Sequence, residues 1–525
     1  MSEPHDRNHP DPLADKKSER KVLLKGAGAN FIGIAGKAIY PIFLFAAVRL
    51  YGSGAFGDYI LAMAVVEAAL RLALGGTADA VQMFVARRQA NQDQPRRMAP
   101  VAEMVSGALW STMFFVALVM GIVVVASGWA SVSLWHKPQL ATMLRIMVLA
   151  LPGAALSALG VGATKGLMIM RHEVTINSFL RPSVLLAATV ALEPLLHDGR
   201  GLAIAYLASY SLAGVAGIWA YAKHFDLKAT LVAALRIRLD RAYLKFVVAQ
   251  NMNTMLGLLN GQLDIIMLGS FVSSSAVGFY GVGNRIAANL RQVKLSFSGI
   301  YSPLVARYHA AGKVHELERT YWMIARWILL AVLPLFVIAV MYRNGLFRLF
   351  VGSTPYPTTF FVLLLVGPLL SCAYGLSGNM ILMAGYSWVT LTNALIAFAI
   401  NGTLNALLIP RMGLVGAALA TMTAALVVTA AQLIEVRRLL GVRPPLGTFV
   451  KPAVAAIVTL GALAGTEWLI AGLALPFHIL AGLASIAIFY ALVWLLGMDP
   501  EDREGLAALR NKLKKRSKPA VPNAQ

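Results

Sequence analysis

The sequence predicts an all-α polytopic membrane protein with about fourteen transmembrane helices, and three observations carry this prediction. Of the 525 residues, 58% are hydrophobic and 13% are charged, whereas a soluble domain carries about 25% charged residues. Apolar runs recur along the chain at the length of about 20 residues that a membrane helix needs. None of these runs alternates in the manner of a transmembrane β-strand. The composition therefore excludes a soluble globule, and the short connections leave no room for a globular catalytic domain.

The first part of the chain predicts a cytoplasmic tail, an N-terminal lobe and a linker. The tail, 1–25, is polar and carries six Lys and Arg residues. The lobe, 26–222, contains six apolar runs, and we predict helices over 26–49, 55–76, 101–128, 141–163, 176–195 and 200–222. The linker, 223–242, has Lys and Arg among Leu, Val and Ala, which is typical of an amphipathic segment on an anionic membrane surface.

The second part predicts a C-terminal lobe, two further helices and a basic tail. The lobe, 243–440, contains six more apolar runs, and we predict helices over 243–268, 276–299, 324–342, 358–379, 384–408 and 412–434. Two additional helices, 449–470 and 476–496, occupy the segment 441–496. The tail, 497–525, carries seven Lys and Arg residues, which attract anionic lipid headgroups if they do not simply set the topology.

The distribution of Lys and Arg predicts the orientation. With the N-terminus in the cytoplasm, 34 of the 46 Lys and Arg residues fall in cytoplasmic segments, 6 fall in outside segments and 6 lie within spans. The cytoplasmic loops are then those near 85–100, 164–182, 222–246, 305–327, 380–388 and 434–452. Because cytoplasmic loops carry an excess of cations, we expect both termini in the cytoplasm. The formal charge of +22 therefore needs no nucleic-acid partner.

Two short motifs recur in the two lobes. Ser53–Tyr59 and Ser274–Tyr280 match at four of seven positions, and Gly201–Ala208 and Gly413–Ala420 match at five of eight. Gly, Ala and Leu recur by chance in membrane helices, but both matches lie six helices apart, which favours a duplication. Six helices return the chain to the same side of the membrane, so both lobes have the same orientation and form a parallel pseudo-repeat. Transporters with such repeats hold their substrate between the halves.

Two cations lie near the middle of predicted spans. Lys37 is about eleven residues into the first predicted helix, and Arg285 is about nine residues into the eighth. A cation at the membrane centre costs about 2.5–3.5 kcal/mol to insert and is usually functional. We expect both side chains to line a polar cavity; the alternative is a structural bond to the carbonyls of a broken helix.

Arg285 belongs to a polar stripe on the eighth predicted helix. Arg285, Asn289 and Gln292 follow the i, i+4, i+7 spacing and share a face. Arg291 and Lys294 approach the cytoplasmic end of the same helix, where they either anchor it or form a cationic vestibule. The uncompensated charge of the expected cavity is positive, so the expected cargo is an anion.

Acidic residues are few in the predicted spans. Glu67 and Arg71 are four residues apart and stack on one face of the second helix. They either neutralise each other or act on the substrate. Asp264 lies near the outer end of the seventh helix, whose polarity is raised by Asn251. Glu67 and Asp264 are the candidates for ion or proton coupling.

The chain resembles the polysaccharide-exporting flippases (Wzx type) of the multidrug/oligosaccharidyl-lipid/polysaccharide superfamily, whose helices follow the same six plus six plus two plan. The residues that carry this resemblance are Asp264, Ser274–Tyr280, Asn284-Arg285, Ser302–Leu304 and Ala306–Gly312. They match a pattern of an acid ending helix 7, a Gly-x-Tyr opening helix 8, an arginine within it, and a Pro-Leu before a basic loop. The resemblance covers nearly the whole chain.

The resemblance implies a flippase of the inner membrane that moves undecaprenyl-pyrophosphate-linked oligosaccharide repeat units to the outer leaflet, for exopolysaccharide or O-antigen (lipopolysaccharide) assembly. It also implies a polysaccharide polymerase or export machinery as a partner. The substrate-binding residues that we predict are Lys37, Arg71, Asn251, Arg285, Asn289, Arg291 and Lys294. We expect no enzymatic activity, no cofactor and no metal, because no phosphate-binding loop and no metal-ligand spacing of His or Cys is present. The alternatives are a multidrug/cation antiporter of the same superfamily and a non-transporting scaffold.

Overall fold

The computed structural model describes residues 36, 38–74, 76–90, 101–167, 169–234, 261–352, 355–443, 447–472 and 474–497. Within these residues every regular element is a helix. The chain divides into two compact units, which are unit 1 (Met1–Gly281 with Leu349–Gly352) and unit 2 (Val282–Arg348 with Ser353–Gln525). The predicted lobe boundaries stay a prediction.

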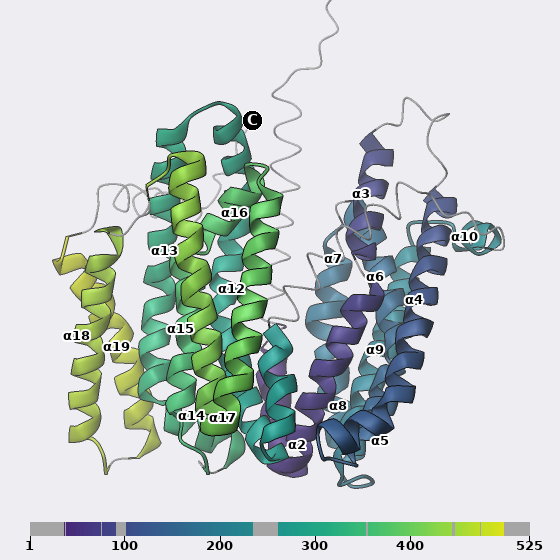
Figure 1. The fold of residues 1–525 in the computed structure, drawn as a ribbon, viewed down its shortest axis with the longest axis horizontal. Coiled ribbons are helices and arrows are strands. Elements are labelled where there is room, and N and C mark those ends of the chain that lie inside the picture. The colour runs from purple at the N-terminus through teal and green to yellow at the C-terminus, as the bar shows by residue number, and fades with distance from the viewer. Residues whose placement is uncertain are drawn as a thin grey trace, which may run out of the picture. The chain divides into compact units, whose positions relative to one another are not determined.

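Unit 1 is built from helices that Figure 1 draws in purple, blue and teal. They are, in chain order, α2 (Ile39–Leu74), α3 (Thr77–Ala90), α4 (Val101–Trp129), the π-helix η2 (Ala130–Leu134), α5 (Leu140–Val148), α6 (Leu151–Gly166), α7 (Arg171–Glu173), the π-helix η3 (Val174–Leu180), α8 (Arg181–Leu192), α9 (Gly199–Ala222) and α10 (Leu227–Ala234). A helix over 261–271 and the first residues of α12 (Ser274–Ala310) complete the unit.

Unit 2 begins within α12 and ends with a pair of helices drawn in yellow-green (Figure 1). Its further helices are α13 (Val314–Met341), α14 (Arg343–Val351), α15 (Thr359–Tyr374), α16 (Leu376–Met383), α17 (Ser387–Leu440), the short 3-10 helix η4 (Gly447–Phe449), α18 (Val450–Leu469) and α19 (Leu475–Leu495). Helix α15 packs between α13 and α17, and the last pair, α18 and α19, packs on α13.

Two of the long helices are each interrupted by one glycine. Gly52 in α2 has φ 78° and Gly413 in α17 has φ 54°, so neither residue is helical. A positive φ is costly for residues with a Cβ and open to glycine. Each interruption lies where the sequence predicts the end of one helix and the start of the next.

The composition of the helices agrees with a membrane environment. Within the described residues, eight helices are long and apolar enough to cross a membrane, or nine if the bent pair α15 and α16 is one span. Each of the fourteen predicted ranges overlaps a helix, but the number of fourteen crossings stays a prediction. Large apolar side chains remain exposed, such as Val125 (83%) and Trp468 (79%), as expected for a surface that faces lipid.

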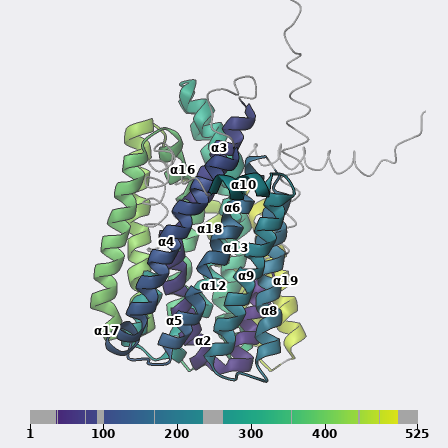
Figure 2. The same ribbon diagram turned by 90° about the vertical axis from the view of Figure 1, so that its right-hand side faces the viewer.

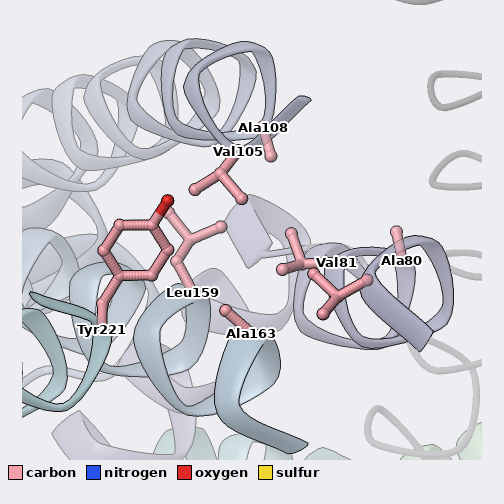
Figure 3. Packing of buried hydrophobic residues seen from close by; sticks show 8 residues of the cluster. Ala80, Val81, Val105, Ala108, Leu159, Ala163 and Tyr221 are labelled. Carbon is pink, nitrogen blue, oxygen red and sulfur yellow. The ribbon is translucent and has the colours of Figure 1, made fainter. Parts of the chain in front are cut away.

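Close packing holds the helices of unit 1 together. Figures 1 and 2 both show α6 and α9 side by side. A Cβ on Gly160 of α6 would lie 2.1 Å from the carbonyl oxygen of Gly217 on α9, so small residues permit this approach. A buried cluster that includes Val81, Val105 and Leu159 joins α3, α4 and α6 (Figure 3). This cluster fixes α3 beside α6, and both helices line the cavity described next.

Candidate functional site

Unit 1 contains a cavity of about 360 Å³, which we call the unit 1 cavity. Its walls come from α2, α3, α6, α7, η3, α8 and α9. The side chains that give it polarity include Arg71, Gln82, Lys165, Asn177, Arg181 and Tyr210. Three cations therefore line the cavity, and one acid, Glu173, accompanies them. Of the predicted substrate-binding residues, Arg71 lies here.

Arg181 is a cavity residue that the sequence analysis missed, because it was counted with the cytoplasmic loop near 164–182 although it also falls in the predicted helix 176–195. The structure extends the helical segment back to Arg171, so that the apolar span runs over Arg171–Leu192. Arg181 is ten residues into this span, which is about 15 Å at 1.5 Å per residue. Its position four residues after Asn177 is the signal that points to a polar face.

The local backbone and Tyr210 position the Arg181 side chain. The seven residues before Arg181 form the π-helix η3, a wider turn than an α-helix and one that is frequent at functional sites. Nη1 of Arg181 donates a hydrogen bond to the Tyr210 hydroxyl at 3.2 Å. The guanidinium carbon also lies 4.8 Å from the centre of the Tyr210 ring, a cation–π distance. Tyr210 is brought there by the close packing of α9 on Gly153 of α6.

An ion pair and a histidine pair lie at α7. Nζ of Lys165 and Oε2 of Glu173 are 3.1 Å apart, and their side chains are 24% and 36% exposed. The neighbouring residue, His172, is buried, and its Nε2 lies 3.1 Å from Nε2 of His224. Within the described residues, no group of three or more potential metal ligands exists. The histidine pair is therefore a hydrogen-bonded contact between α7 and the end of α9.

Glu67 and Arg71 do not form the ion pair that their spacing allows. Glu67 accepts a hydrogen bond from Nε2 of Gln262 at 3.1 Å, and it is close enough to Arg181 to interact with it electrostatically. Arg71 is exposed toward the unit 1 cavity, and no ion pair joins it to Glu67 in the described part of the chain. The two residues therefore have different surroundings.

Two buried carboxylates lie near the junction of helix 261–271 with α12. Asp264 is 3% exposed and accepts a hydrogen bond from the Tyr280 hydroxyl. Asp58, which the sequence analysis did not single out, is also 3% exposed and accepts hydrogen bonds from Ser274 Oγ and from Gln139 Nε2. Both carboxylates are therefore hydrogen-bonded.

Lys137 ties the helix 261–271 to the loop between η2 and α5. Its Nζ donates to the carbonyl oxygens of Gly269 (2.8 Å) and Val272 (3.1 Å) at the end of that helix, where a cation is favoured by the helix dipole. Burial lowers the pKa of the Lys137 ammonium, and the charge of Asp58 partly offsets this effect.

The two copies of the first repeated motif contact each other. The hydroxyls of Ser53 and Ser275 lie 3.1 Å apart. A Cβ on Gly57 would lie 1.6 Å from the Ser274 carbonyl oxygen, and one on Gly278 would lie 3.1 Å from the Gly57 Cα. Glycine at both places therefore permits α2 and the start of α12 to touch.

In unit 2, Lys294 reaches a break between two helices. Its Nζ donates to Ser371 Oγ at 3.1 Å, beside Gly375, where α15 and α16 meet at an angle of 47°. Arg285 is half-buried, whereas Asn289 and Arg291 are exposed. Lys294 is thus bonded to a hydroxyl beside this break.

Two predicted residues, Lys37 and Asn251, lie outside the described residues. Of the others, Glu67, Arg71 and Asp264 belong to unit 1, and Arg285, Asn289, Arg291 and Lys294 belong to unit 2. The expectation that these residues line one cavity stays a prediction.

Sequence comparison relates the chain to one protein family. Residues 47–356 match the profile of a family described as polysaccharide biosynthesis protein. No curated protein sequence matches the chain.

Solved structures with the same fold are membrane transporters. The lipid II flippase MurJ in an inward closed conformation has a TM-score of 0.67 at 14% identity, covering 89% of this chain and 98% of that one. An inward-facing MATE family multidrug transporter of the MOP superfamily has a TM-score of 0.57 at 15% identity, covering 78% and 98%. A MOP superfamily transporter from Pyrococcus furiosus, noted for the reverse polarity of its binding pocket, has a TM-score of 0.56 at 15% identity, covering 80% and 96%. At these identities the likeness establishes the fold alone.

Proposed function

The chain belongs to the polysaccharide biosynthesis protein family, with the fold of the MOP superfamily flippases, and from this premise we propose that it flips a lipid-linked oligosaccharide. The cargo is an undecaprenyl-pyrophosphate-linked repeat unit, moved from the inner to the outer leaflet of the cytoplasmic membrane for exopolysaccharide or O-antigen assembly. Both termini lie in the cytoplasm. A polysaccharide polymerase takes the cargo on the outer side.

The observation that carries this proposal is the charge of the unit 1 cavity. Arg71, Lys165 and Arg181 line it with Glu173, so positive charge exceeds negative charge. Guanidinium groups bind phosphate oxygens through charge-assisted and often bidentate hydrogen bonds. A cationic lining thus favours a phosphorylated cargo.

The predicted residues have distinct roles in this proposal. Those that contact the cargo are Lys37, Arg71, Asn251, Arg285, Asn289, Arg291 and Lys294. Glu67 and Asp264 are the two acids available for coupling to an ion or proton gradient. The chain acts as a carrier and not as an enzyme.

The second candidate function is a MATE-like antiporter of cationic drugs, because two transporters that share the fold are multidrug transporters. A cationic cargo requires acids that are free to pair with it. In unit 1, Asp58 and Asp264 are engaged by serine, glutamine and tyrosine donors. The Pyrococcus furiosus transporter, noted for the reverse polarity of its binding pocket, supports the view that pocket polarity varies within this fold.

The test is complementation of a bacterial strain that lacks its own flippase for lipid-linked repeat units. We expect the chain to restore surface polymer and to leave resistance to cationic drugs unchanged. Arg145→Gln is a control, because Arg145 bonds to Ser127 outside the cavity, and we expect it to restore polymer fully. Raised drug resistance without polymer would instead support the antiporter.

A further inference from the structure

Unit 1 contains a second cavity, of about 330 Å³, which we call the Asp58 cavity. Its walls come from α2 just after the break at Gly52, from the first turns of α5 and α9, and from Ser274 of α12. On α2, Asp58 lies thirteen residues before Arg71, which is about 20 Å at 1.5 Å per residue. The Asp58 cavity is therefore separate from the unit 1 cavity.

The charge of the Asp58 cavity has the opposite sign to that of the unit 1 cavity. Its described lining carries two carboxylates, Asp58 and Asp198, and one cation, Arg200. Nε of Arg200 lies 3.1 Å from Oδ2 of Asp198, so this pair is balanced and the carboxylate of Asp58 gives the cavity its net charge. Such a lining repels a carboxylate or a phosphate and admits an uncharged ligand.

Asp58 is buried and is held by two neutral donors. It is 3% exposed, and its carboxylate accepts hydrogen bonds from Ser274 Oγ and from Gln139 Nε2. A carboxylate has about four lone-pair sites, so about two of them remain for a ligand in the cavity that Asp58 lines. The acceptor is therefore fixed in position before a ligand arrives.

The repeated motif indicates that packing does not require an acid at this position. Asp58 is the sixth residue of Ser53–Tyr59, and the sixth residue of the other copy, Ser274–Tyr280, is Phe279. Both side chains are buried. Since a buried carboxylate costs more free energy than a buried phenyl ring, we attribute the acid to ligand binding.

The size and the hydrogen-bonding groups of the cavity suit one sugar ring. Gln139 is exposed and lines the cavity, and its amide has a second N–H donor and a carbonyl acceptor. Hydroxyl groups both donate and accept, so a sugar can bond to Asp58 and to Gln139 together. A volume of about 330 Å³ is at the lower end of the roughly 300–1,000 Å³ of small-molecule sites, too small for a whole oligosaccharide.

We propose that the Asp58 cavity is a sugar subsite that takes one uncharged monosaccharide unit, with Asp58 and Gln139 bonding to its hydroxyl groups. This inference rests on the proposed function, and it goes further because it assigns a class of sugar, uncharged and not acidic, to a site outside the unit 1 cavity. Ser274 is a positioning residue, since it acts by holding Asp58.

Protection of a cysteine from alkylation tests the subsite in the purified full-length chain in detergent. Cys372→Ala removes the native cysteine, which is buried, and Thr142→Cys places a reporter at an exposed position of the cavity lining. The probes are the methyl glycosides of glucose, galactose, mannose and N-acetylglucosamine, with methyl glucuronide as the acidic sugar. His197→Cys is the matched control reporter, because His197 is exposed in the connection between α8 and α9 and is not part of the described lining.

We expect at least one uncharged glycoside to protect the reporter at Thr142. At ten times its dissociation constant it should slow alkylation by about tenfold, because an occupied site is not labelled. Methyl glucuronide should not protect this reporter, and the reporter at His197 should react at an unchanged rate with every probe. The absence of protection by all four uncharged glycosides, or equal protection by methyl glucuronide, would overturn the proposal.

Two variants test the charge of the cavity. Asp58→Asn replaces a charged acceptor by a neutral one, and we expect the glycoside to bind about tenfold more weakly. Asp198→Asn keeps the N-cap of α9, since asparagine caps a helix as well as aspartate does, and it therefore serves if Asp58→Asn fails to fold. It removes one negative charge and leaves Arg200 without its carboxylate partner, so methyl glucuronide should now protect the reporter. Unchanged selectivity in both variants would also overturn the proposal.

Flipping assays show whether the sugar belongs to the cargo. A protecting glycoside should slow the transfer of a lipid-linked oligosaccharide that contains the same sugar, and transfer that is indifferent to it would overturn the assignment to the cargo. The subsite and the function fail in different ways. Flipping without any protection would overturn the subsite and leave the function standing, whereas protection without any flipping would support the subsite and overturn the function.

Discussion

Arg285 lies half-buried in α12, in the part of this helix that belongs to unit 2. If its guanidinium holds a phosphate of the cargo, Arg285→Ala should abolish polymer production while the amount of protein in the membrane stays the same. Arg285→Lys should restore only part of the activity, because an ammonium is a point charge and cannot form the bidentate contact. Polymer yield and immunoblotting of membranes measure both effects, and full activity of the alanine variant would contradict the assignment.

Variants of Glu67 and Arg71 test whether a spacing of four residues on one helix is enough to make them an ion pair. Because Glu67 bonds to Gln262 and Arg71 faces the unit 1 cavity, the charge-swapped double variant, Glu67→Arg with Arg71→Glu, should be as inactive as either single variant. A double-mutant cycle on polymer yield measures this directly. Rescue by the swap would show that the two residues act mainly on each other.

The sequence allowed a single residue to be placed in a membrane span only where the start of its helix could also be predicted. Arg71 could be placed in a span because its helix is strongly apolar around it. Arg181 was counted with a loop, because its span begins at Arg171, in a segment where Arg171 and Glu173 lie close together and resemble a loop. Asp58 lies within a repeated motif, and its hydrogen-bond partners Ser274 and Gln139 are distant in sequence.

At the scale of the element, the contact between α2 and α12 depends on glycine. A Cβ on Gly57 would lie 1.6 Å from the Ser274 carbonyl oxygen, so Gly57→Ala must push the backbones apart. Overpacking typically costs about 1–3 kcal/mol, and we expect a lower melting temperature in detergent and reduced polymer yield. Gly121→Ala in α4 is the matched control, because a Cβ there meets no atom within 4 Å; it should be neutral or slightly stabilising, since alanine is favoured over glycine in a helix by about 1 kcal/mol. Equal stability of the two variants would contradict this account.

The helix ends were predictable from the sequence where a glycine interrupts the helix. They were not predictable where contacts with other helices determine the end. The breaks at Gly52 and Gly413 fall within a few residues of the predicted helix ends. The predicted helix 141–163 corresponds to one apolar span, Leu140–Gly166, which a short turn at 149–150 divides into α5 and α6. Pro152, in the first turn of α6, has no N–H to donate. The π-helix η3 has no marker in its sequence, because such turns arise from the contacts around them.

At the scale of the whole molecule, composition and the recurrence of apolar runs were sufficient to predict an all-α membrane protein. The resemblance to polysaccharide flippases was likewise supported by the family that the chain matches over residues 47–356. Composition could not reveal which polar residues share a cavity, since this depends on the packing of seven different elements around Arg71 and Arg181.

The source of energy is a property of the whole transporter. An anionic headgroup that moves outward from a negative interior is favoured by the membrane potential, at about 2.3 kcal/mol per charge per 100 mV. We therefore predict that transport in proteoliposomes follows the potential when the pH gradient is zero. Transport that follows the pH gradient at zero potential, and that is lost in Glu67→Gln or Asp264→Asn, would show proton coupling instead.

The central claim is that this chain moves an anionic, lipid-linked oligosaccharide across a bilayer. The most direct test reconstitutes the purified chain in vesicles that contain a fluorescent undecaprenyl-pyrophosphate oligosaccharide, and measures how much sugar becomes accessible to a lectin on the opposite side. We predict transfer well above that of protein-free vesicles, strongly reduced by Arg181→Gln and unchanged by Arg145→Gln, with no movement of a cationic dye. Transfer no faster than in protein-free vesicles, together with proton-driven movement of the dye, would contradict the account.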